Sequence, residues 1–228
     1  MKKLIPLLIL TMISGCWSKK PTPTPTPSVP VETKPEPKPE PTTEPTRVDP
    51  DKSKFATPRW ETIKNKDNYT TMAHEELLAH GRYLLQGELA DVKEFCTKCT
   101  ASRLDMMTYL LSTMAEKESY FRPELEYKES FKDTKGRNVI STGLFQLSLE
   151  SSQQKRYSCG FEKQSDLYSE RGNIRCAIKI LNALSKENGR LHGRVNGAWQ
   201  GGSRYWSVLR TTRADAYNFI IGKMKETF

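Results

Sequence analysis

One carboxyl group in this sequence lies where burial would make it an acid at neutral pH. Leu104, Met107, Leu111 and Met114 recur at intervals of three or four residues, and Glu118 follows on the same helical face. Desolvation and the negative end of a helix both disfavour a carboxylate there, so we expect a raised pKa for Glu118. A carboxyl group of this kind is suited to general acid catalysis.

The same pattern has a structural alternative. A buried Glu118 paired with an arginine or a backbone amide would stabilise the fold and transfer no proton. Glu116 points almost the opposite way on the helix, and we expect it on the solvated surface.

The elements that must position this group are mostly helices. Apolar residues recur at helical spacing in four segments, Met72–Leu85, Ser102–Lys117, Ile174–Leu184 and Arg213–Lys225. The charged, turn-rich stretch Pro123–Thr142 has alternating segments on both sides of Thr134-Lys135-Gly136, which predict a small hairpin. The fold class is therefore mainly α with a small β element.

Four cysteines lie in the part of the chain that can build a core: Cys96, Cys99, Cys159 and Cys176. An even number suits disulfides in an exported chain. The Cys96–Cys99 spacing also occurs in zinc sites and redox pairs, but no second such pair and no ligand-spaced histidine accompanies it. We expect two structural disulfides and no metal. Of three possible pairings we prefer the local one, Cys96 with Cys99 and Cys159 with Cys176.

The first sixteen residues have the pattern of an export signal. Lys2 and Lys3 precede an apolar stretch that is too short to span a bilayer. Ile13-Ser14-Gly15-Cys16 resembles a bacterial lipobox, which implies cleavage after residue 15 and lipidation of Cys16. An ordinary secretory signal with an incidental cysteine is the alternative. Trp17 stands where an Asp would resemble the inner-membrane retention signal, so we expect an outer-membrane anchor that faces the periplasm.

Residues 16–52 are expected to form a lipidated, Pro/Thr-rich disordered linker. Eleven of the thirty residues from Pro21 to Pro50 are proline, and no aromatic residue interrupts them. Such a stretch favours polyproline II and is long enough to hold a domain roughly 90 Å from its anchor. A docking site for proline-recognition modules is the alternative. Residues 53–228 remain for the folded domain.

The charge balance favours an anionic partner. Lys and Arg number 36 against 27 Asp and Glu, for a net charge of +9. Nucleic acid, lipid head groups and an acidic cell-wall polymer all fit this surplus. The hydrophobic fraction of 36% excludes a polytopic membrane protein.

Four segments in order resemble one family of enzymes. Glu118-Ser119-Tyr120-Phe121-Arg122-Pro123 resembles the Glu-Ser-x-x-x-Pro motif of soluble lytic transglycosylases, and Gly143-Leu144-Phe145-Gln146-Leu147 resembles their Gly-Leu-Met-Gln motif. The helix that begins at Asn173 and the segment Ala198-Trp199-Gln200-Gly201-Gly202 follow in the family's order. Goose-type lysozymes share most of these motifs, and the resemblance covers a little under half of the chain.

The resemblance implies a lysozyme-like domain that cleaves the β-1,4 bond between N-acetylmuramic acid and N-acetylglucosamine in peptidoglycan. Glu118 takes the place of the catalytic acid. In a lytic transglycosylase the same residue would then help the muramic 6-hydroxyl to close a 1,6-anhydro ring. In an inverting lysozyme a second carboxylate would activate water.

The interval between Glu118 and Gln146 is longer than in a typical transglycosylase. The extra length contains Glu124, Glu126, Glu129 and Asp133. Asp133 precedes Gly136-Arg137-Asn138 in a looser version of the goose-type spacing, which makes it the candidate base. Its alternative role is that of a turn residue beside Gly136.

Six further residues are candidates for substrate binding: Ser119, Phe145, Gln146, Trp199, Gln200 and Tyr205. Ser119 has two alternatives to binding a sugar: holding the catalytic carboxyl group, or covering the helix end. Trp199 and Gln200 replace the family's Tyr and Asn, and that Tyr is expected to hydrogen-bond the catalytic Glu. Trp can donate but not accept, so this departure affects the geometry of the acid. Trp199, Tyr205 and Trp206 lie close enough in sequence to stack on sugar rings, although such aromatic residues also build cores.

Two functions of different classes follow. The first is a lipid-anchored, monomeric muramidase that acts on peptidoglycan glycan strands without a cofactor. The second is a non-catalytic peptidoglycan-binding or inhibitor-like lipoprotein with the same fold. Nothing beyond charge favours nucleic acid, and we expect contact with a membrane only through the N-terminal lipid.

Overall fold

The computed structural model describes residues 57–95 and 101–228. The predictions for the signal peptide, the lipidated Cys16, the linker, Cys96 and Cys99 lie outside these residues. The described residues belong to the compact unit Asp49–Phe228. Among them, no helix is both long and apolar enough to cross a membrane.

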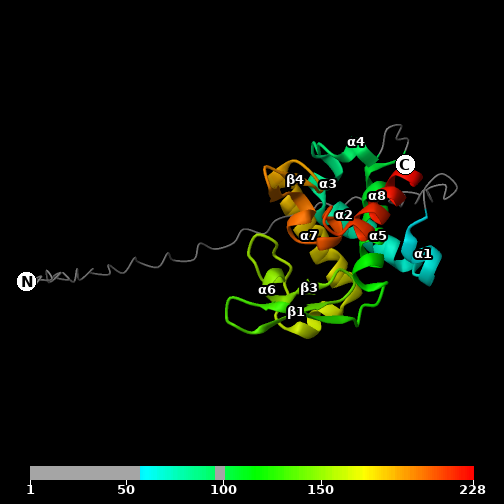
Figure 1. Ribbon diagram of the computed structural model, residues 1–228. Helices are drawn as coiled ribbons and strands as arrows, with labels where there is room; N and C mark the ends of the chain where they lie inside the picture. The colour runs from blue at the N-terminus through cyan, green and yellow to red at the C-terminus, as the bar shows by residue number, and fades with distance from the viewer. Residues whose placement is uncertain (1–56, 96–100) are drawn as a thin grey trace, which may run out of the picture. The chain divides into compact units, whose positions relative to one another are not determined.

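Helices dominate the fold, and short strands make up a minor part (Figure 1). The α-helices are α1 (Arg59–Lys64), α2 (Asp67–His80), α3 (Arg82–Gln86), α4 (Val92–Phe95), α5 (Arg103–Ser119), α6 (Leu149–Ser152), α7 (Glu170–Asn188) and α8 (Ala214–Thr227). The strands are β1 (Glu126–Lys132), β2 (Asn138–Thr142), β3 (Leu147–Ser148), β4 (Arg194–Val195) and β5 (Ala198–Trp199). Three 3-10 helices complete the elements, η2 (Gln164–Tyr168), η3 (Gly201–Arg204) and η4 (Ser207–Leu209). This confirms the mainly α class with a small β element.

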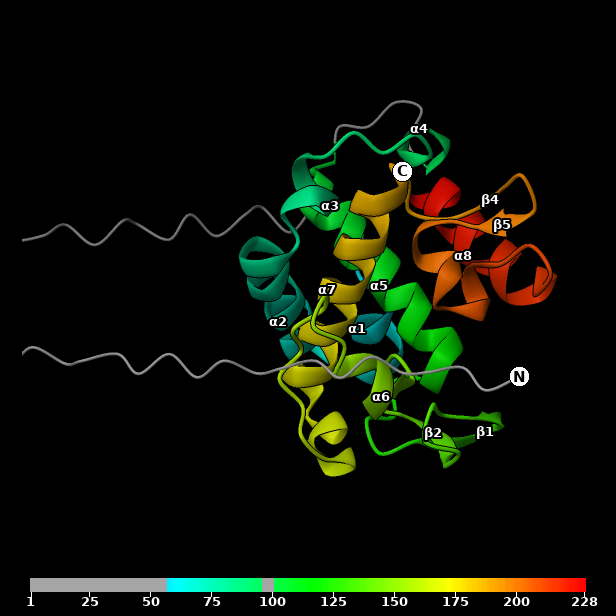
Figure 2. The same cartoon turned by 90° about the vertical axis from the view of Figure 1, so that its left-hand side faces the viewer.

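Helix α5 is the centre of the core. Ser102 caps its N-terminus, where the Ser102 hydroxyl accepts a hydrogen bond from the Asp105 amide at 3.2 Å. Every residue from Met106 to Ala115 is buried, which is typical of a helix surrounded on all sides. Helices α1, α2, α3 and α8 pack against it (Figure 2). The predicted helix Ser102–Lys117 is confirmed.

Two other predicted helices are also found, α8 close to its expected bounds and α7 longer than Ile174–Leu184 at both ends. The prediction of one helix over Met72–Leu85 is wrong, because Gly81 separates α2 from α3. A Cβ atom at Gly81 would lie 2.8 Å from the Leu77 carbonyl oxygen. Asn182 accepts hydrogen bonds from the Tyr83 and Leu84 amides, so α7 stabilises the start of α3.

A three-stranded antiparallel sheet lies at the C-terminal end of α5 (Figures 1 and 2). Strands β1 and β2 pair Tyr127 with Ser141 and Lys128 with Ile140, and the register shifts between Lys128 and Lys132. The predicted hairpin is therefore confirmed, with a bulge in its first strand. Bulges are common beside active sites, where they redirect a side chain.

A disulfide joins Cys159 to Cys176 in α7, with a Cα–Cα distance of 5.0 Å. This confirms the local pairing for these two residues. It closes a loop of 17 residues and so stabilises the fold by about 3 kcal/mol.

Candidate active site

Glu118 lies in the last turn of α5, directly after the buried residues of that helix. Its side chain is half-buried. The pKa of Glu118 is raised from 4.5 to about 8, mainly by burial and also by the charge of Glu129, against an opposing contribution from Arg213. A carboxyl group with this pKa is mostly protonated at pH 7 and can donate a proton there.

Glu116 differs from its prediction. Both of its carboxylate oxygens accept hydrogen bonds from Arg59, at 2.7 and 3.0 Å, and only 10% of the side chain is exposed. The residue is an ion-paired contact between α1 and α5, and the expectation of a solvated surface residue is wrong.

The helix that carries Glu118 ends in an unusual backbone. Tyr120 and Phe121 both have positive φ angles, 52° and 61°. Left-handed conformations of residues other than glycine cost about 1–3 kcal/mol each and occur preferentially at functional sites. The turn buries Phe121 and exposes Tyr120, so the chain leaves the helix abruptly after Glu118 and Ser119.

Ser119 connects the end of α5 to the next motif. Its side chain is 2% exposed, and its hydroxyl donates to the Leu144 carbonyl oxygen at 3.0 Å. This agrees with the structural alternative and corrects the expectation that Ser119 contacts substrate. Ser119 holds Glu118 beside the Gly143–Leu147 segment.

The Gly143–Leu147 segment is fixed by buried polar groups. The Asn173 side chain accepts from the Phe145 amide at 2.9 Å and donates to the Thr142 and Leu167 carbonyl oxygens. The indole of Trp206 donates to the Phe145 carbonyl oxygen at 3.0 Å. Because the Phe145 ring is fully buried, the expectation that it faces substrate is corrected.

Gln146 has a positive φ of 48° and a half-buried side chain. Its amide nitrogen donates to the carbonyl oxygens of Leu125 and Gly143. The side chain thus ties the start of β1 to the motif beside Glu118.

Glu129 is the second carboxylate of the site. It is the half-buried residue of the otherwise exposed β1 and lies where the register of the hairpin shifts. The Ser141 hydroxyl donates to Glu129 Oε1 at 2.6 Å. After burial, the charge of Glu129 is the next contribution to the raised pKa of Glu118.

Asp133, the expected base, is instead a turn residue. One carboxylate oxygen accepts from the Lys135 and Arg137 amides at 2.9 and 2.8 Å, and the other accepts from Arg137 Nε at 2.7 Å. Desolvation alone would raise the pKa of Asp133, but the hydrogen bonds from Arg137 and Lys135 together outweigh it, so the pKa of Asp133 is lowered. All of these contacts are within the hairpin turn, which corrects the expectation that Asp133 acts beside Glu118.

Tyr205 directly follows η3 and is half-buried. Its hydroxyl accepts a hydrogen bond from the Ser148 amide at 3.2 Å. Burial raises the pKa of Tyr205, and the charge of Glu118 adds to this. Tyr205 therefore supplies a phenol whose pKa responds to the candidate acid. Trp199, which replaces the family's Tyr in the sequence, has no phenol to offer.

Trp199 and Gln200 lie in and after the short strand β5. The guanidinium groups of Arg194 and Arg210 lie 5.1 and 5.7 Å from the Trp199 ring. Gln200 donates from its amide nitrogen to the Ala198 carbonyl oxygen at 3.4 Å. Both side chains are half-buried, so part of each remains open to a ligand.

In the described part of the chain, no three His, Cys, Asp or Glu side chains gather in a way that would hold a metal ion.

Solved structures of one protein are similar to this chain. The wild-type form of Bd0314 DslA, a Bdellovibrio protein, is 34% identical, with a TM-score of 0.69. The match covers 75% of this chain and 96% of that chain. This chain belongs to the DslA family. No protein-family model and no curated protein matches the sequence.

Two further DslA structures each have a single glutamate replaced by glutamine. They are 35% and 34% identical to this chain, and both have a TM-score of 0.69. The matches cover 95% and 96% of the two DslA chains. The two replaced glutamates of DslA are eleven positions apart.

Proposed function

We propose that this member of the DslA family is a muramidase with a lysozyme-like domain. It cleaves the β-1,4 bond between N-acetylmuramic acid and N-acetylglucosamine in peptidoglycan. The observation that carries the proposal is Glu118, a half-buried carboxyl group with a pKa of about 8 at the end of a buried helix. The resemblance of the surrounding motifs to lytic transglycosylases and goose-type lysozymes supplies the substrate class.

In this proposal Glu118 is the general acid. It donates its proton to the glycosidic oxygen as the bond between that oxygen and the anomeric carbon breaks, and the anomeric carbon takes on oxocarbenium character. The leaving sugar departs with a hydroxyl group, and Glu118 becomes a carboxylate. Ser119 fixes the end of the helix that carries Glu118 through its hydrogen bonds to the Ala115 and Leu144 carbonyl oxygens.

Glu129 is the proposed second carboxylate. Its negative charge stabilises the oxocarbenium-like centre, and as a base it can take a proton from the water that attacks the anomeric carbon. The spacing of the DslA variants supports this pair. Glu118 and Glu129 are eleven positions apart, and no other two glutamates in the sequence have that spacing.

The charge of the chain suits the proposed substrate. A net charge of +9 favours association with an anionic polymer. The predicted lipid anchor and proline-rich linker would hold the domain within reach of the cell wall, so we propose an exported protein that works on the periplasmic side of the outer membrane.

The test is the release of soluble muropeptides from purified peptidoglycan by the full chain. We expect release by the wild type and by Glu124→Gln, a matched control at an exposed glutamate of the same segment. We expect release to fall by at least a thousandfold in Glu118→Gln, because the general acid is lost. A wild type that binds peptidoglycan without releasing muropeptides would support the non-catalytic alternative.

Mass analysis of the products decides the mechanism. Reducing ends on the muramic acid indicate hydrolysis with Glu129 as the base, whereas 1,6-anhydro ends indicate transglycosylation in which Glu118 performs both proton transfers.

A further inference from the structure

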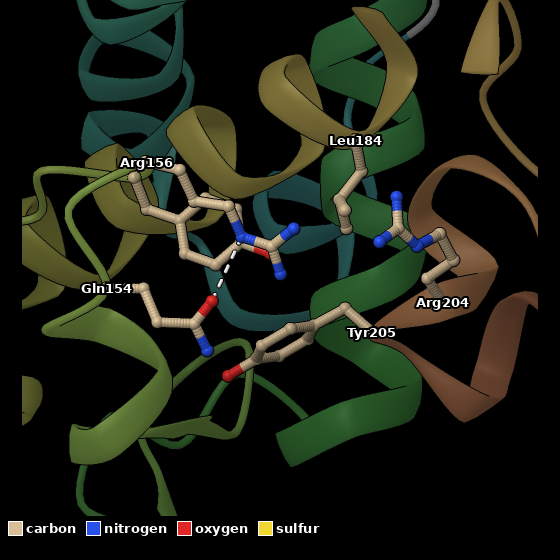
Figure 3. A pocket seen from close by; sticks show the side chains of 6 residues that line it. Gln154, Arg156, Leu184, Arg204 and Tyr205 are labelled. Carbon is tan, nitrogen blue, oxygen red and sulfur yellow. Dashed lines mark hydrogen bonds between the residues drawn. The ribbon is translucent and has the colours of Figure 1, made fainter. Parts of the chain in front are cut away.

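A cavity of about 140 Å³ lies between the segment after α6, helix α7 and the end of η3 (Figure 3). Its lining residues come from the segment after α6, from α7 and from the end of η3: Gln154, Arg156, Tyr157, Leu184, Arg204 and Tyr205. Tyr205 connects this cavity to the candidate active site, because it lines the cavity and its hydroxyl accepts from the Ser148 amide. Ser148 pairs with Ser141, whose hydroxyl donates to Glu129. We call the cavity the arginine pocket.

The arginine pocket has a positive charge. Nη1 of Arg156 lies 3.5 Å from Glu187 Oε1, and Nη1 of Arg204 donates to Glu187 Oε2. Two guanidinium groups against one carboxylate leave one positive charge in excess. Each guanidinium has five N–H donors, so both arginines keep donors for a second carboxylate.

The positions of the two guanidinium groups are set before any ligand arrives. Arg156 Nε donates to Gln154 Oε1 at 2.9 Å, and the Arg156 guanidinium lies 4.5 Å from the centre of the Tyr157 ring. Figure 3 shows the guanidinium groups of Arg156 and Arg204 directed toward one another across the pocket, with the Tyr205 ring beside them. The charges of both arginines also lower the pKa of Tyr157, whose net shift is upward because of burial.

We propose that the arginine pocket binds a carboxylate on the muramic acid side of the glycan strand. The inference rests on the proposed function and adds a substrate feature to it. Peptidoglycan offers this chemistry from two sources, the carboxylates of the stem peptide and, where the stem has been removed, the lactyl carboxylate itself. A glycan bound in the pocket would contact Tyr205, which is bonded to the β3 strand that pairs with β2 beside Glu129.

The test measures binding by the full chain with the Glu118→Gln substitution, which prevents turnover. Three ligands are compared by calorimetry: a disaccharide with its stem peptide, the same disaccharide with a free lactyl carboxylate, and a chitin tetrasaccharide without a carboxylate. We expect Arg204→Gln and Arg156→Gln each to weaken binding of a carboxylate-bearing ligand by roughly tenfold. We expect no change for the chitin tetrasaccharide.

Two controls separate charge recognition from damage to the fold. Arg171→Gln removes an exposed, ion-paired arginine that does not line the pocket, and it should leave all affinities unchanged. Arg204→Lys keeps the charge and should retain most of the affinity. The ligand that loses more affinity in Arg204→Gln identifies the source of the carboxylate.

Equal affinities of wild-type and Arg-substituted proteins for the carboxylate-bearing ligands would overturn the inference, as would an equal loss for the chitin tetrasaccharide. Absence of binding to all three ligands would overturn it as well. The proposed muramidase activity is tested separately, by muropeptide release from the protein with Glu118 intact. Carboxylate binding in the arginine pocket and muramidase activity can therefore fail independently.

Discussion

The negative charge of Glu129, on β1, raises the pKa of Glu118, at the end of α5. The two groups come from different elements, and the Ser141 hydroxyl bonded to Glu129 Oε1 keeps that carboxylate in place. Paired carboxyl groups with different environments are the arrangement that separates an acid from a base.

Replacement of Glu129 by Gln should lower the pKa of Glu118, because it removes a neighbouring negative charge. The carbon-13 chemical shift of the Glu118 carboxyl group, followed by NMR between pH 4 and pH 10, measures this. Glu124→Gln is the control and should leave the titration unchanged. An identical Glu118 titration in Glu129→Gln would show that the two groups do not interact.

Glu118→Gln should change how stability depends on pH. The pKa of Glu118 is about 8 in the folded chain against an ordinary value of 4.5, so the folded state holds this proton more tightly than the unfolded state. The contribution of the protonated Glu118 to the free energy of unfolding is fully present below pH 4.5 and is lost as the pH rises through 8. The wild type should therefore lose roughly 1–3 kcal/mol at this site between pH 5 and pH 9, a value kept small because the group is only half-buried. Glu118→Gln should lack this part of the loss in urea unfolding at the two pH values. Equal losses in both proteins would remove the basis for the raised pKa.

Asn173→Ala should lower activity more than its effect on stability explains. The substitution leaves the Phe145 amide and two carbonyl oxygens without their partner, which costs about 2–4 kcal/mol. It also frees the segment that holds Ser119 and hence Glu118. Asn182→Ala is the control, since it removes a half-buried side-chain amide that bonds to the start of α3. Both variants should have a lower melting temperature than the wild type. At temperatures well below these midpoints, where both variants are folded, only Asn173→Ala should release muropeptides more slowly than the wild type.

Gly143→Ala should be far more damaging than Gly136→Ala. Both glycines have positive φ angles, 84° and 75°, so each substitution costs about 1 kcal/mol in backbone strain. A Cβ atom at Gly143 would also lie 2.3 Å from Asn173 Nδ2, whereas one at Gly136 meets nothing within 4 Å. Thermal unfolding of the two variants should show the difference, and equal melting temperatures would contradict the tight fit between Gly143 and Asn173.

The sequence predicted the parts of the structure that depend on local spacing. The position of Glu118 followed from the stripe through Leu104 and Met114, and the hairpin followed from alternation on both sides of its turn. The break at Gly81 was missed because the apolar pattern continues across it. The small hairpin of β4 and β5 was also missed, although Asn196-Gly197, both with positive φ, is a strong turn signal.

The site itself depended on contacts that spacing does not show. Glu129 was one of several acidic residues in the insertion, and only the bulge in β1 makes it half-buried while Asp133 remains in the turn. The roles of Asn173 and Trp206 depend on contacts with Phe145 across 28 and 61 positions of sequence. Tyr205 was a candidate for its aromatic ring, but its proximity to Glu118 required the folded chain.

The most direct measurement is kcat/KM for muropeptide release by the wild-type chain from pH 5 to pH 10. Because kcat/KM reports the ionisation of the free enzyme, loss of the Glu118 proton should make it decline with an apparent pKa of about 8. A value that stays constant to pH 10, or that already falls near pH 4.5, would contradict the role of Glu118 as a protonated general acid.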